Sequence, residues 1–335
     1  MDQILLTYIL PVFNTEKYVL RALQSIVGQG LQPNEYEVLA VDDGSTDSSR
    51  MVVETFAKDN PQIKLFIQQN TGVSAARNLA MNNASGRYLM FVDSDDYLNE
   101  GVMPDLLKRA IDNDLDVLSF NYCCKDVQGN ELPHTRDDNY ATTDAMTGYE
   151  FLESHSMTPY VWRFLLRRDY VERHQWRFDN SLIVCEDGAL IAKFMLNAPR
   201  MAHDNKVTYC YVKRGDSAMH NPAPSHLRRR IYSQVDAAAS INATAREFEK
   251  VSGFKAPASV DGLRNVYLYF SMTKALVCGM VTDVVERIRK AGLYPFPCVG
   301  PESDYHGMKW KIIHLPMMHP CLWNLLSKVY RMIKK

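Results

Sequence analysis

The chain has 335 residues, enough for one large or two modest domains, and its 46% hydrophobic and 23% charged residues are ordinary for a soluble globular protein. A formal net charge of −1 gives no overall electrostatic reason to expect a nucleic-acid partner. The first residues lack the pattern of a signal peptide, and no apolar run reaches the roughly eighteen residues of a membrane-spanning helix, so we expect a cytoplasmic protein. Seven cysteines without a Cys-x-x-Cys pair or zinc-ligand spacing predict reduced thiols.

Apolar runs alternate with amphipathic stretches through the first 120 residues. This alternation favours an α/β fold with a mostly parallel sheet that helices cover on both faces. The middle of the chain is more irregular, and from about 225 the pattern becomes helical, so we divide the chain at 1–122, 123–222 and 223–335. Strands are predicted at 4–12, 36–41, 63–68, 88–92 and 116–122, and helices at 16–28, 48–58, 73–83, 102–113, 227–250 and 262–280.

Acidic residues follow two of the predicted strands. Asp42 and Asp43 end the second strand. Asp93 and Asp95 end the fourth. Because ligands bind at the carboxyl ends of parallel strands, we expect these four side chains to meet at one edge of the sheet. Neighbouring carboxylates repel each other, and a divalent cation held by oxygen ligands would relieve that repulsion.

A second group of acids, Asp112, Asp114 and Asp116, lies at the opposite edge of the predicted sheet. There a helix ends and a turn leads into the next strand. We therefore interpret these three as a solvated turn.

Two strand-to-helix turns have the composition of binding loops. In the first, Gly44 permits a tight turn, and a carboxylate at the strand end can accept hydrogen bonds from a base or ribose. The alternative is a helix N-cap formed by Ser45 or Asp47. The second turn, at 69–78, has small residues and places Arg77 one turn into a helix. That arginine is either a surface residue or the partner of a phosphate or an acid.

Four segments stand in order at the carboxyl ends of predicted strands: Pro11-Val-Phe-Asn14, Val41-Asp-Asp-Gly-Ser-Thr-Asp47, Asn70-Thr-Gly-Val-Ser-Ala-Ala-Arg-Asn78 and Phe91-Val-Asp-Ser-Asp-Asp96. Together they resemble the motif series of family-2 glycosyltransferases with the GT-A fold, over residues 4 to about 120. The resemblance implies a Rossmann-like sheet flanked by helices, followed here by a helical C-terminal extension. It also implies a nucleotide-diphosphate-sugar donor, with a UDP-sugar the leading choice, a divalent cation (Mn or Mg) as cofactor, and transfer with inversion.

The resemblance also implies roles for single residues. Asp93 corresponds to the first acid of the metal motif, near the ribose, and Asp95 to the acid that ligates the metal bridging the diphosphate. Arg214 and Ser217 lie in a segment similar to one in which an Arg and a Ser approach the diphosphate, and His220 is either a metal ligand or only a polar contact. The nucleotide-sugar-binding residues implied in this way are Pro11, Phe13, Asn14, Asp42, Asp43, Arg77, Asp93, Ser94, Arg214 and Ser217.

An inverting displacement needs a base that takes the proton of the acceptor hydroxyl. The family places an acid pair late in the domain, and Leu182-Ile-Val-Cys-Glu-Asp-Gly-Ala-Leu190 fits that pattern. The resemblance implies Asp187 as general base and Glu186 as a supporting or acceptor-binding group. The alternative is that both acids only favour the first turn of a helix.

Trp162 stands where the family often has a Trp in a Trp-x-Lys-Leu pattern. Phe164 occupies the Lys position, a departure from the family pattern, so the charged acceptor contact that the pattern implies is not expected from this residue. Trp162 either stacks on an acceptor sugar or closes a hydrophobic core.

The segment 306–335 combines six basic residues and no acid with Trp, Leu and Ile side chains. A helix is predicted at about 321–334, and it would suit an anionic membrane surface. The alternative is a packed terminal helix whose Lys tips reach solvent. The resemblance, and not the composition of this segment, implies an enzyme that extends a lipid-linked glycan on the inner face of a bacterial envelope, and membrane contact would fit that role.

The sequence therefore predicts an inverting, metal-dependent glycosyltransferase that acts on a hydroxyl of a glycan or lipid-linked acceptor. Residues 1–122 would bind the donor, 123–222 would bind the acceptor and supply the base, and 223–335 would form the extension. A nucleotidyltransferase is one rival, but it should have a Gly-rich basic loop after the first strand, which 11–17 lacks. A non-catalytic sugar-nucleotide or membrane-binding module is the other, and it predicts that Asp187 is dispensable.

Overall fold

The computed structural model describes residues 4–134, 139–214 and 224–294. The chain forms two compact units, each assembled from segments that are separate in sequence. The first unit comprises Met1–Phe151, Tyr160–Asn180 and Ala198–Ser217. The second comprises Leu152–Pro159, Ser181–Asn197 and Ala218–Lys335.

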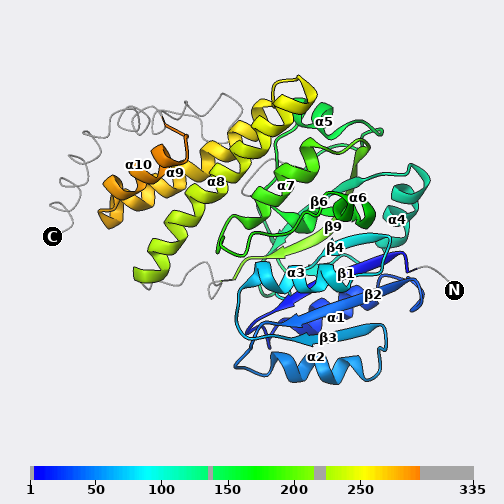
Figure 1. The fold of residues 1–335 in the computed structure, drawn as a ribbon. Helices are drawn as coiled ribbons and strands as arrows, with labels where there is room; N and C mark the ends of the chain where they lie inside the picture. Colours follow the sequence, from blue (N-terminus) through cyan, green and yellow to red (C-terminus); the bar gives the residue numbers. More distant parts are fainter. Residues whose placement is uncertain (1–3, 135–138, 215–223, 295–335) are drawn as a thin grey trace. The chain divides into compact units, whose positions relative to one another are not determined.

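The first unit is built around one sheet with the strand order β3-β2-β1-β4-β8-β6-β9-β5, and β7 pairs with β6 (Figure 1). β3, β2, β1 and β4 run parallel. β8 runs antiparallel to both β4 and β6, whereas β6 and β9 run parallel to each other. The strands are β1 (Leu6–Val12), β2 (Tyr36–Asp42), β3 (Ile63–Ile67), β4 (Tyr88–Phe91), β5 (Tyr97–Leu98), β6 (Val117–Lys125), β7 (Glu131–Leu132), β8 (Phe164–Arg167) and β9 (Met201–Val212).

Helices cover the parallel part of this sheet. Every residue of β1 and β2 is buried, as expected for strands whose alternating side chains meet helices on both faces. α3 packs against both strands, and α1 packs against α2. The helices are α1 (Val19–Val27), α2 (Ser49–Ala57), α3 (Val73–Asn83), α4 (Met103–Asp112), α5 (Gly148–Ser154), which passes into the second unit, and α6 (Arg168–Arg173), together with the short 3-10 helix η1 (Val161–Arg163).

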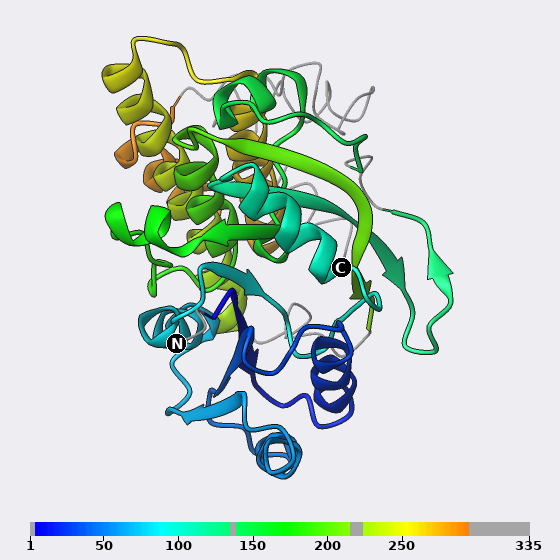
Figure 2. The same cartoon turned by 90° about the vertical axis from the view of Figure 1, so that its right-hand side faces the viewer.

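The predicted α/β fold and the strands and helices predicted before residue 125 are confirmed, with boundary shifts of a few residues. The mostly parallel character holds for β3-β2-β1-β4, whereas the other half of the sheet is mixed. The middle of the chain, which looked irregular in sequence, contributes β8 and β9. β9 bends along its length beside β6, where the register shifts near Phe120 and Asn121 (Figure 2).

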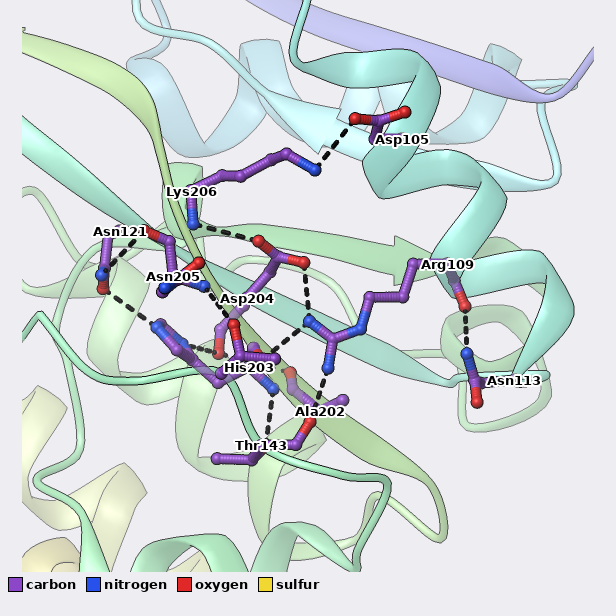
Figure 3. Close-up of polar contacts among 12 residues, drawn as sticks. Asp105, Arg109, Asn113, Asn121, Thr143, Ala202, His203, Asp204, Asn205 and Lys206 are labelled. Carbon is purple, nitrogen blue, oxygen red and sulfur yellow. Dashed lines mark hydrogen bonds and ion pairs between the residues drawn. The ribbon is translucent and has the colours of Figure 1, made fainter.

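A polar cluster fastens the start of β9 to its neighbours (Figure 3). Arg109 of α4 donates to the Asp204 carboxylate at 2.6 Å and to the carbonyl of His203 at 2.9 Å. The fully buried His203 ring lies 2.8 Å from Ser119 Oγ and 2.9 Å from Asn121 Oδ1. Because both ring nitrogens have partners, the imidazole is accommodated in the core without an unpaired polar atom.

The acids at the amino-terminal edge of the sheet correct one expectation. Asp116 is 1% exposed, pairs with Arg167, and accepts a hydrogen bond from the Arg200 backbone at 3.1 Å. Asp114, which is largely exposed, also pairs with Arg167, at 2.8 Å. The solvated-turn interpretation is therefore wrong for Asp116, because this carboxylate is an internal ion-pair partner where β6 begins.

The described part of the second unit is mainly helical: α7 (Glu186–Leu196), α8 (Pro224–Ser252), α9 (Ala258–Cys278) and α10 (Val281–Lys290) (Figure 1). α8 and α9 pack side by side, Ser271 Oγ donates to the Ile231 carbonyl at 3.0 Å, and α10 contacts both helices. The predicted helical extension is thereby confirmed over 224–290. Within the described ranges, no helix combines the length and the apolar character needed to cross a membrane. The basic segment 306–335, with its predicted helix and membrane contact, lies outside the described residues.

Candidate functional site

The loops after β1 and β2 are tied together by side-chain hydrogen bonds. Asn14 adopts a left-handed backbone conformation with φ 51°, and its Oδ1 accepts from the Thr46 backbone at 2.9 Å. Its own N–H donates to Ser45 Oγ at 3.1 Å. Asp47 accepts from the Ser49 backbone at 2.9 Å and so satisfies an N–H of the first turn of α2, although the N-cap position itself is Ser48. Phe13 is 40% exposed on this loop and is therefore available to stack on a ligand.

Glycine is required where the second loop approaches the third. Gly44 has φ +74°, a left-handed conformation that costs other residues strain. A Cβ atom there would lie 3.0 Å from the Asn70 backbone nitrogen. The two strand-to-helix turns can therefore close on each other only with glycine at this position.

The two acids that end β2 are both buried but differ in their bonding. The Asp43 carboxylate accepts hydrogen bonds from the Thr71 and Gly72 backbones at 2.8 and 2.9 Å and from Gln68 Nε2 at 2.8 Å. Asp43 thus fixes the turn that enters α3. In the described residues, the Asp42 carboxylate accepts one hydrogen bond, from the Ser45 backbone at 3.2 Å. Asp42 therefore has more acceptor capacity left for a ligand than Asp43 does.

Arg77 meets an acid rather than solvent. Its guanidinium donates to Asp93 Oδ1 at 2.9 Å, and its side chain is 4% exposed. The guanidinium carbon also lies 5.2 Å from the ring centroid of Phe178, a cation–π contact. The small residues of the 69–78 turn and the position of Arg77 on α3 thus serve to bring a fixed positive charge to the end of β4.

Asp95 is paired with Arg214, which follows β9. The Arg214 Nε donates to Asp95 Oδ2 at 2.7 Å, and the guanidinium carbon lies 5.2 Å from the Tyr18 ring centroid. Burial, and then the charge of Asp93, raise the pKa of Asp95, and Arg214 opposes this effect. Asp93 and Asp95 are thus close enough to repel each other, and each is matched with its own arginine.

Two residues of this site were not predicted from the sequence. Asp96 is 1% exposed, accepts from the Tyr209 hydroxyl at 2.9 Å and from the Val212 backbone at 2.7 Å. The same Tyr209 oxygen accepts from the Asp93 backbone at 3.0 Å. Asp96 and Tyr209 therefore join the acidic loop to β9, which ends at Val212, two residues before Arg214. The third acid of Asp-Ser-Asp-Asp was the sequence signal available for this role.

The side chains of Ser94 and Trp162, both candidates for contact with a ligand, are buried and make contacts within the protein. Ser94 is 4% exposed, and its Oγ accepts from Thr15 Oγ1 at 2.9 Å. Trp162 is 3% exposed, and its ring stacks on Tyr209 with centroids 4.2 Å apart and on Tyr160 at 4.9 Å. The burial supports the core-packing alternative for Trp162, because little of its ring remains for an acceptor sugar.

The acid pair Glu186 and Asp187 lies in the second unit, in the first turn of α7, as predicted. The preceding segment is anchored by Ser233 of α8, whose Oγ accepts from the Ile183 and Val184 backbones at 3.0 and 3.2 Å. Ser233 also donates to the Val184 carbonyl at 2.8 Å. These bonds fix the backbone that leads into the acid pair.

Two residues that flank the acid pair, Cys185 and Gly188, have conformations or surroundings that few other residues would allow. Cys185 adopts φ 65°, an uncommon conformation for a residue with a side chain. The Tyr267 hydroxyl of α9 lies close to Gly188, where a Cβ atom would be 2.2 Å from the hydroxyl oxygen. Glycine at 188 is therefore needed for α9 to pack against the start of α7.

The donor set suits a divalent cation in part. Asp93 and Asp95 offer carboxylate oxygens, which Mg²⁺ and Mn²⁺ prefer, and Mg²⁺ commonly takes only one or two carboxylates together with substrate phosphates. Among the described residues, no group of three or more His, Cys, Asp or Glu side chains could hold a metal by itself. The residues present thus fit a cation whose remaining ligands come from a diphosphate and water. His220 and Ser217 lie outside the described residues.

Comparisons with known proteins point to one family. A family model described as "Glycosyl transferase family 2" matches residues 7–197. Glycosyltransferase GlyA of Streptococcus pneumoniae is 33% identical over 219 residues, which cover 63% of this chain and 31% of GlyA. Uncharacterized glycosyltransferase EpsJ of Bacillus subtilis is 28% identical over 236 residues, which cover 70% of this chain and 68% of EpsJ. The matched part of the chain thus spans about a third of GlyA and about two thirds of EpsJ.

The solved structures of Staphylococcus aureus TarS 1–349 have a similar fold. The complex with UDP gives a TM-score of 0.66 at 20% sequence identity and covers 98% of this chain and 91% of that one. The complex with UDP-GlcNAc gives a TM-score of 0.60 at 22% identity and covers 91% and 99%. This likeness confirms the predicted GT-A fold.

Proposed function

Because the chain belongs to the glycosyl transferase family 2 and is a glycosyltransferase, we propose that it moves a sugar from a UDP-sugar to an acceptor hydroxyl, with inversion at the anomeric carbon. One observation carries the proposal. Asp93 and Asp95 lie together at the carboxyl end of β4, where Asp93 is paired with Arg77 of the preceding helix and Asp95 with Arg214, 119 residues further along the chain. An arrangement that gathers two acids and two arginines at a ligand-binding edge suits a diphosphate and its cation.

The donor would be bound by the first unit. Phe13 offers an exposed ring on which the nucleotide base could stack, and the Asp42 carboxylate could accept hydrogen bonds from N–H groups of the base. Arg214, whose Nε donates to Asp95 Oδ2 at 2.7 Å, would also donate a hydrogen bond to the diphosphate. UDP is supported as the nucleotide because structurally similar TarS 1–349 has been solved with UDP and with UDP-GlcNAc.

A divalent cation, Mn²⁺ or Mg²⁺, would be held by Asp95 with Asp93 nearby. When bound, such a cation supplies Lewis-acid stabilisation of the negative charge that develops on the departing nucleoside diphosphate. The chain's own contribution is to hold the two carboxylates in position. Arg77 of α3 pairs with Asp93, and the Tyr209–Asp96 hydrogen bond holds the loop that carries both acids.

Asp187 is proposed as the general base and Glu186 as its support. The acceptor oxygen would form its bond to the anomeric carbon while the bond from that carbon to the diphosphate breaks, and the hydroxyl proton would pass to the Asp187 carboxylate. Asp187 stands at the start of α7, where Ser233 hydrogen-bonds the backbone that precedes it and Tyr267 lies close to Gly188, which follows it. A base must be held within hydrogen-bond reach of its proton, so rigid anchoring of this turn is what the role requires.

The acceptor is proposed to be a hydroxyl of a bacterial glycan or lipid-linked glycan. Among related proteins, Staphylococcus aureus TarS is named as a poly(ribitol-phosphate) β-N-acetylglucosaminyltransferase and is 30% identical over 207 residues, which cover 62% of this chain and 35% of TarS. N-acetylglucosamine is therefore the first sugar to test. Contact of 306–335 with the inner face of the cytoplasmic membrane is proposed on composition alone.

The test is a panel of nucleotide sugars, incubated with the purified protein in the presence of Mn²⁺, Mg²⁺ or a chelator, with release of the free nucleotide measured. We expect one UDP-sugar to be hydrolysed or transferred much faster than the others, and the chelator to suppress that activity. A preference for a nucleoside triphosphate with release of pyrophosphate would favour a nucleotidyltransferase instead. Tight UDP binding without turnover on any donor and acceptor would favour a non-catalytic module.

A further inference from the structure

Two cysteines face each other across neighbouring strands of the first unit. Cys123 of β6 and Cys210 of β9 are directly paired in the parallel register, and their Sγ atoms lie 3.2 Å apart. Neighbouring strands are about 4.8 Å apart, which falls within the about 4.4–6.8 Å between Cα atoms that a disulfide spans. The backbone therefore already has the spacing that a bond between these two sulfurs needs.

The two thiols have different surroundings. Cys210 is fully buried, and its Sγ also lies 3.1 Å from Asn99 Oδ1. Cys123 is only partly buried, and Lys125 is on the same strand face, two residues further along β6. The Cys123 thiol is thus partly exposed and close to the Lys125 cation, whereas the neighbouring Cys210 thiol is buried.

This asymmetry extends to acidity. The hydrogen bond with Cys210, helped by the charge of Lys125 and opposed by burial and by Glu131, lowers the pKa of Cys123 to about 7. The hydrogen bond with Cys123 and then burial raise the pKa of Cys210, and Tyr97 is the other titratable side chain that contacts it. Cys123 is therefore the more acidic of the two thiols and the one that supplies the thiolate. An accessible, acidic thiol beside a second cysteine is the arrangement found in redox-sensitive sites.

We propose that Cys123 and Cys210 form a site of reversible oxidation, in which a hydroperoxide converts the pair to a disulfide between β6 and β9. The Cys123 thiolate attacks one peroxide oxygen, an S–O bond forms as the O–O bond breaks, and the sulfur is oxidised to a sulfenic acid. The other peroxide oxygen leaves as hydroxide and combines with the proton that Cys123 released, which gives the first water. The Cys210 sulfur then attacks the Cys123 sulfur, and the S–O bond breaks as the S–S bond forms. The Cys210 proton leaves with the released hydroxide as water, so that two thiols and one hydrogen peroxide give one disulfide and two waters.

The test uses the full chain, reduced and then treated with increments of hydrogen peroxide, quenched with N-ethylmaleimide and digested without a reductant. Mass spectrometry should find the peptides containing 123 and 210 joined, and dithiothreitol should release them. At pH 7, iodoacetamide should modify Cys123 on the order of tenfold faster than exposed Cys278, because more of Cys123 is thiolate. Burial raises the pKa of Cys278, which makes it a suitable slow reference.

Single substitutions separate the roles of the two sulfurs. Cys123→Ser should leave Cys210 as an unmodified thiol, whereas Cys210→Ser should leave Cys123 to proceed to sulfinic acid because no partner traps the sulfenic acid. Cys278→Ser is the matched control and should not change the cross-link. The oxidised wild-type protein should also unfold at a higher temperature than the reduced one, and Cys123→Ser should remove that difference. Failure to recover the 123–210 cross-link, or oxidation of Cys278 before Cys123, would overturn the proposal.

Discussion

The acidic residues after β4 are held in place by a tyrosine that lies more than a hundred residues away in sequence. The Tyr209 hydroxyl donates to Asp96 at 2.9 Å and accepts from the Asp93 backbone at 3.0 Å. Tyr209 and Asp96 are both essentially buried, so neither of these groups can exchange its partner for water. A single hydroxyl thus fixes both ends of the Asp93–Asp96 turn.

Tyr209→Phe should therefore weaken both the fold and the donor site. The substitution keeps the ring that stacks on Trp162 but leaves the Asp93 N–H and the Asp96 carboxylate without that partner. We expect a loss of about 1–3 kcal/mol in the free energy of unfolding. Because the loop that carries Asp93 and Asp95 becomes less fixed, we also expect several-fold weaker metal-dependent binding of UDP. Urea denaturation and titration calorimetry measure the two effects.

Tyr211→Phe is the matched control. Tyr211 also stacks on Trp162, with centroids 6.0 Å apart, but its side chain is 36% exposed. The Tyr211→Phe substitution should leave both the free energy of unfolding and the affinity for UDP close to the wild-type values. If Tyr209→Phe had as little effect as Tyr211→Phe, the aromatic stack, which both substitutions keep, and not the hydroxyl bridge would hold the acidic turn.

Single site residues could be predicted where their sequence neighbours reveal their position, and could not where their partners are distant in sequence. Asp93, Asp95 and Arg77 were found because each lies at a strand end or helix start that neighbouring residues reveal. Asp96 and Tyr209 were missed because their contact joins positions 113 residues apart, which no local pattern encodes. Trp162 was identified as a candidate, but its burial depends on side chains from several other segments and so could not be decided from its own neighbourhood.

At the scale of whole elements, one buried carboxylate joins three strands to the turn before β4. Glu37 of β2 accepts from Thr7 of β1 at 2.8 Å and from Lys64 of β3 at 2.9 Å. It also accepts from the backbone and hydroxyl of Ser85 at 2.7 and 2.6 Å. Burial alone would raise the pKa of Glu37, but these hydrogen bonds outweigh it and lower the pKa below its ordinary value of 4.5.

The stability that Glu37 contributes should therefore depend on pH with a definite sign. Since the pKa is lower in the folded state, the contribution is complete above the unfolded-state value near 4.5 and is lost as the pH falls through the folded-state value. Glu37→Gln should cost about 1–3 kcal/mol at pH 7, because the amide NH₂ replaces an acceptor needed by Ser85 or Lys64. Urea unfolding at pH 7 and at successively lower pH should show this difference shrinking below pH 4.5.

An exposed pair provides the comparison. Glu54 pairs with Arg50 at 2.7 Å on the surface of α2, where both side chains are about half exposed. Glu54→Gln should change the unfolding free energy by less than about 0.5 kcal/mol at every pH. A constant cost of Glu37→Gln across the acid range would contradict the linkage argument.

The elements themselves were predictable where the signal is local. β1 to β4 and their helices follow from short apolar runs that alternate with amphipathic ones, because parallel strands need helical connections. β8 was hidden in an aromatic stretch because its burial comes from antiparallel partners, β4 and β6. β9 was missed because its polar start, including Asp204 and His203, is compatible with a strand only through its long-range partners Arg109, Ser119 and Asn121.

For the whole molecule, the two units carry different parts of the proposed chemistry. Asp42, Asp93, Asp95, Arg77 and Arg214 belong to the first unit, whereas Glu186 and Asp187 belong to the second. The first group has the acids and arginines suited to a nucleotide diphosphate, and the second has an acid pair on an anchored helix start. Binding of the nucleotide and transfer of the sugar should therefore be separable by substitution.

Asp187→Asn should abolish transfer while nucleotide binding survives. The amide cannot take the acceptor proton, and removal of a general base typically lowers the rate by about 10²–10⁴-fold. UDP affinity, measured by calorimetry with Mn²⁺, should stay within about twofold of the wild type, since the substituted residue is not among the donor-binding groups. Loss of a negative charge from the first turn of α7 should reduce stability by no more than about 1 kcal/mol.

Asp95→Asn provides the opposite pattern and makes the comparison decisive. Removing this carboxylate leaves Arg214 without its 2.7 Å partner and deprives a cation of a ligand, so UDP affinity with Mn²⁺ should fall while affinity measured in chelator changes little. If Asp187→Asn lost UDP binding as severely as Asp95→Asn, Asp187 would belong to the donor site and could not be the base. If Asp187→Asn kept full transfer activity, the proton would have to pass to another group, and Glu186 would be the next acid to substitute.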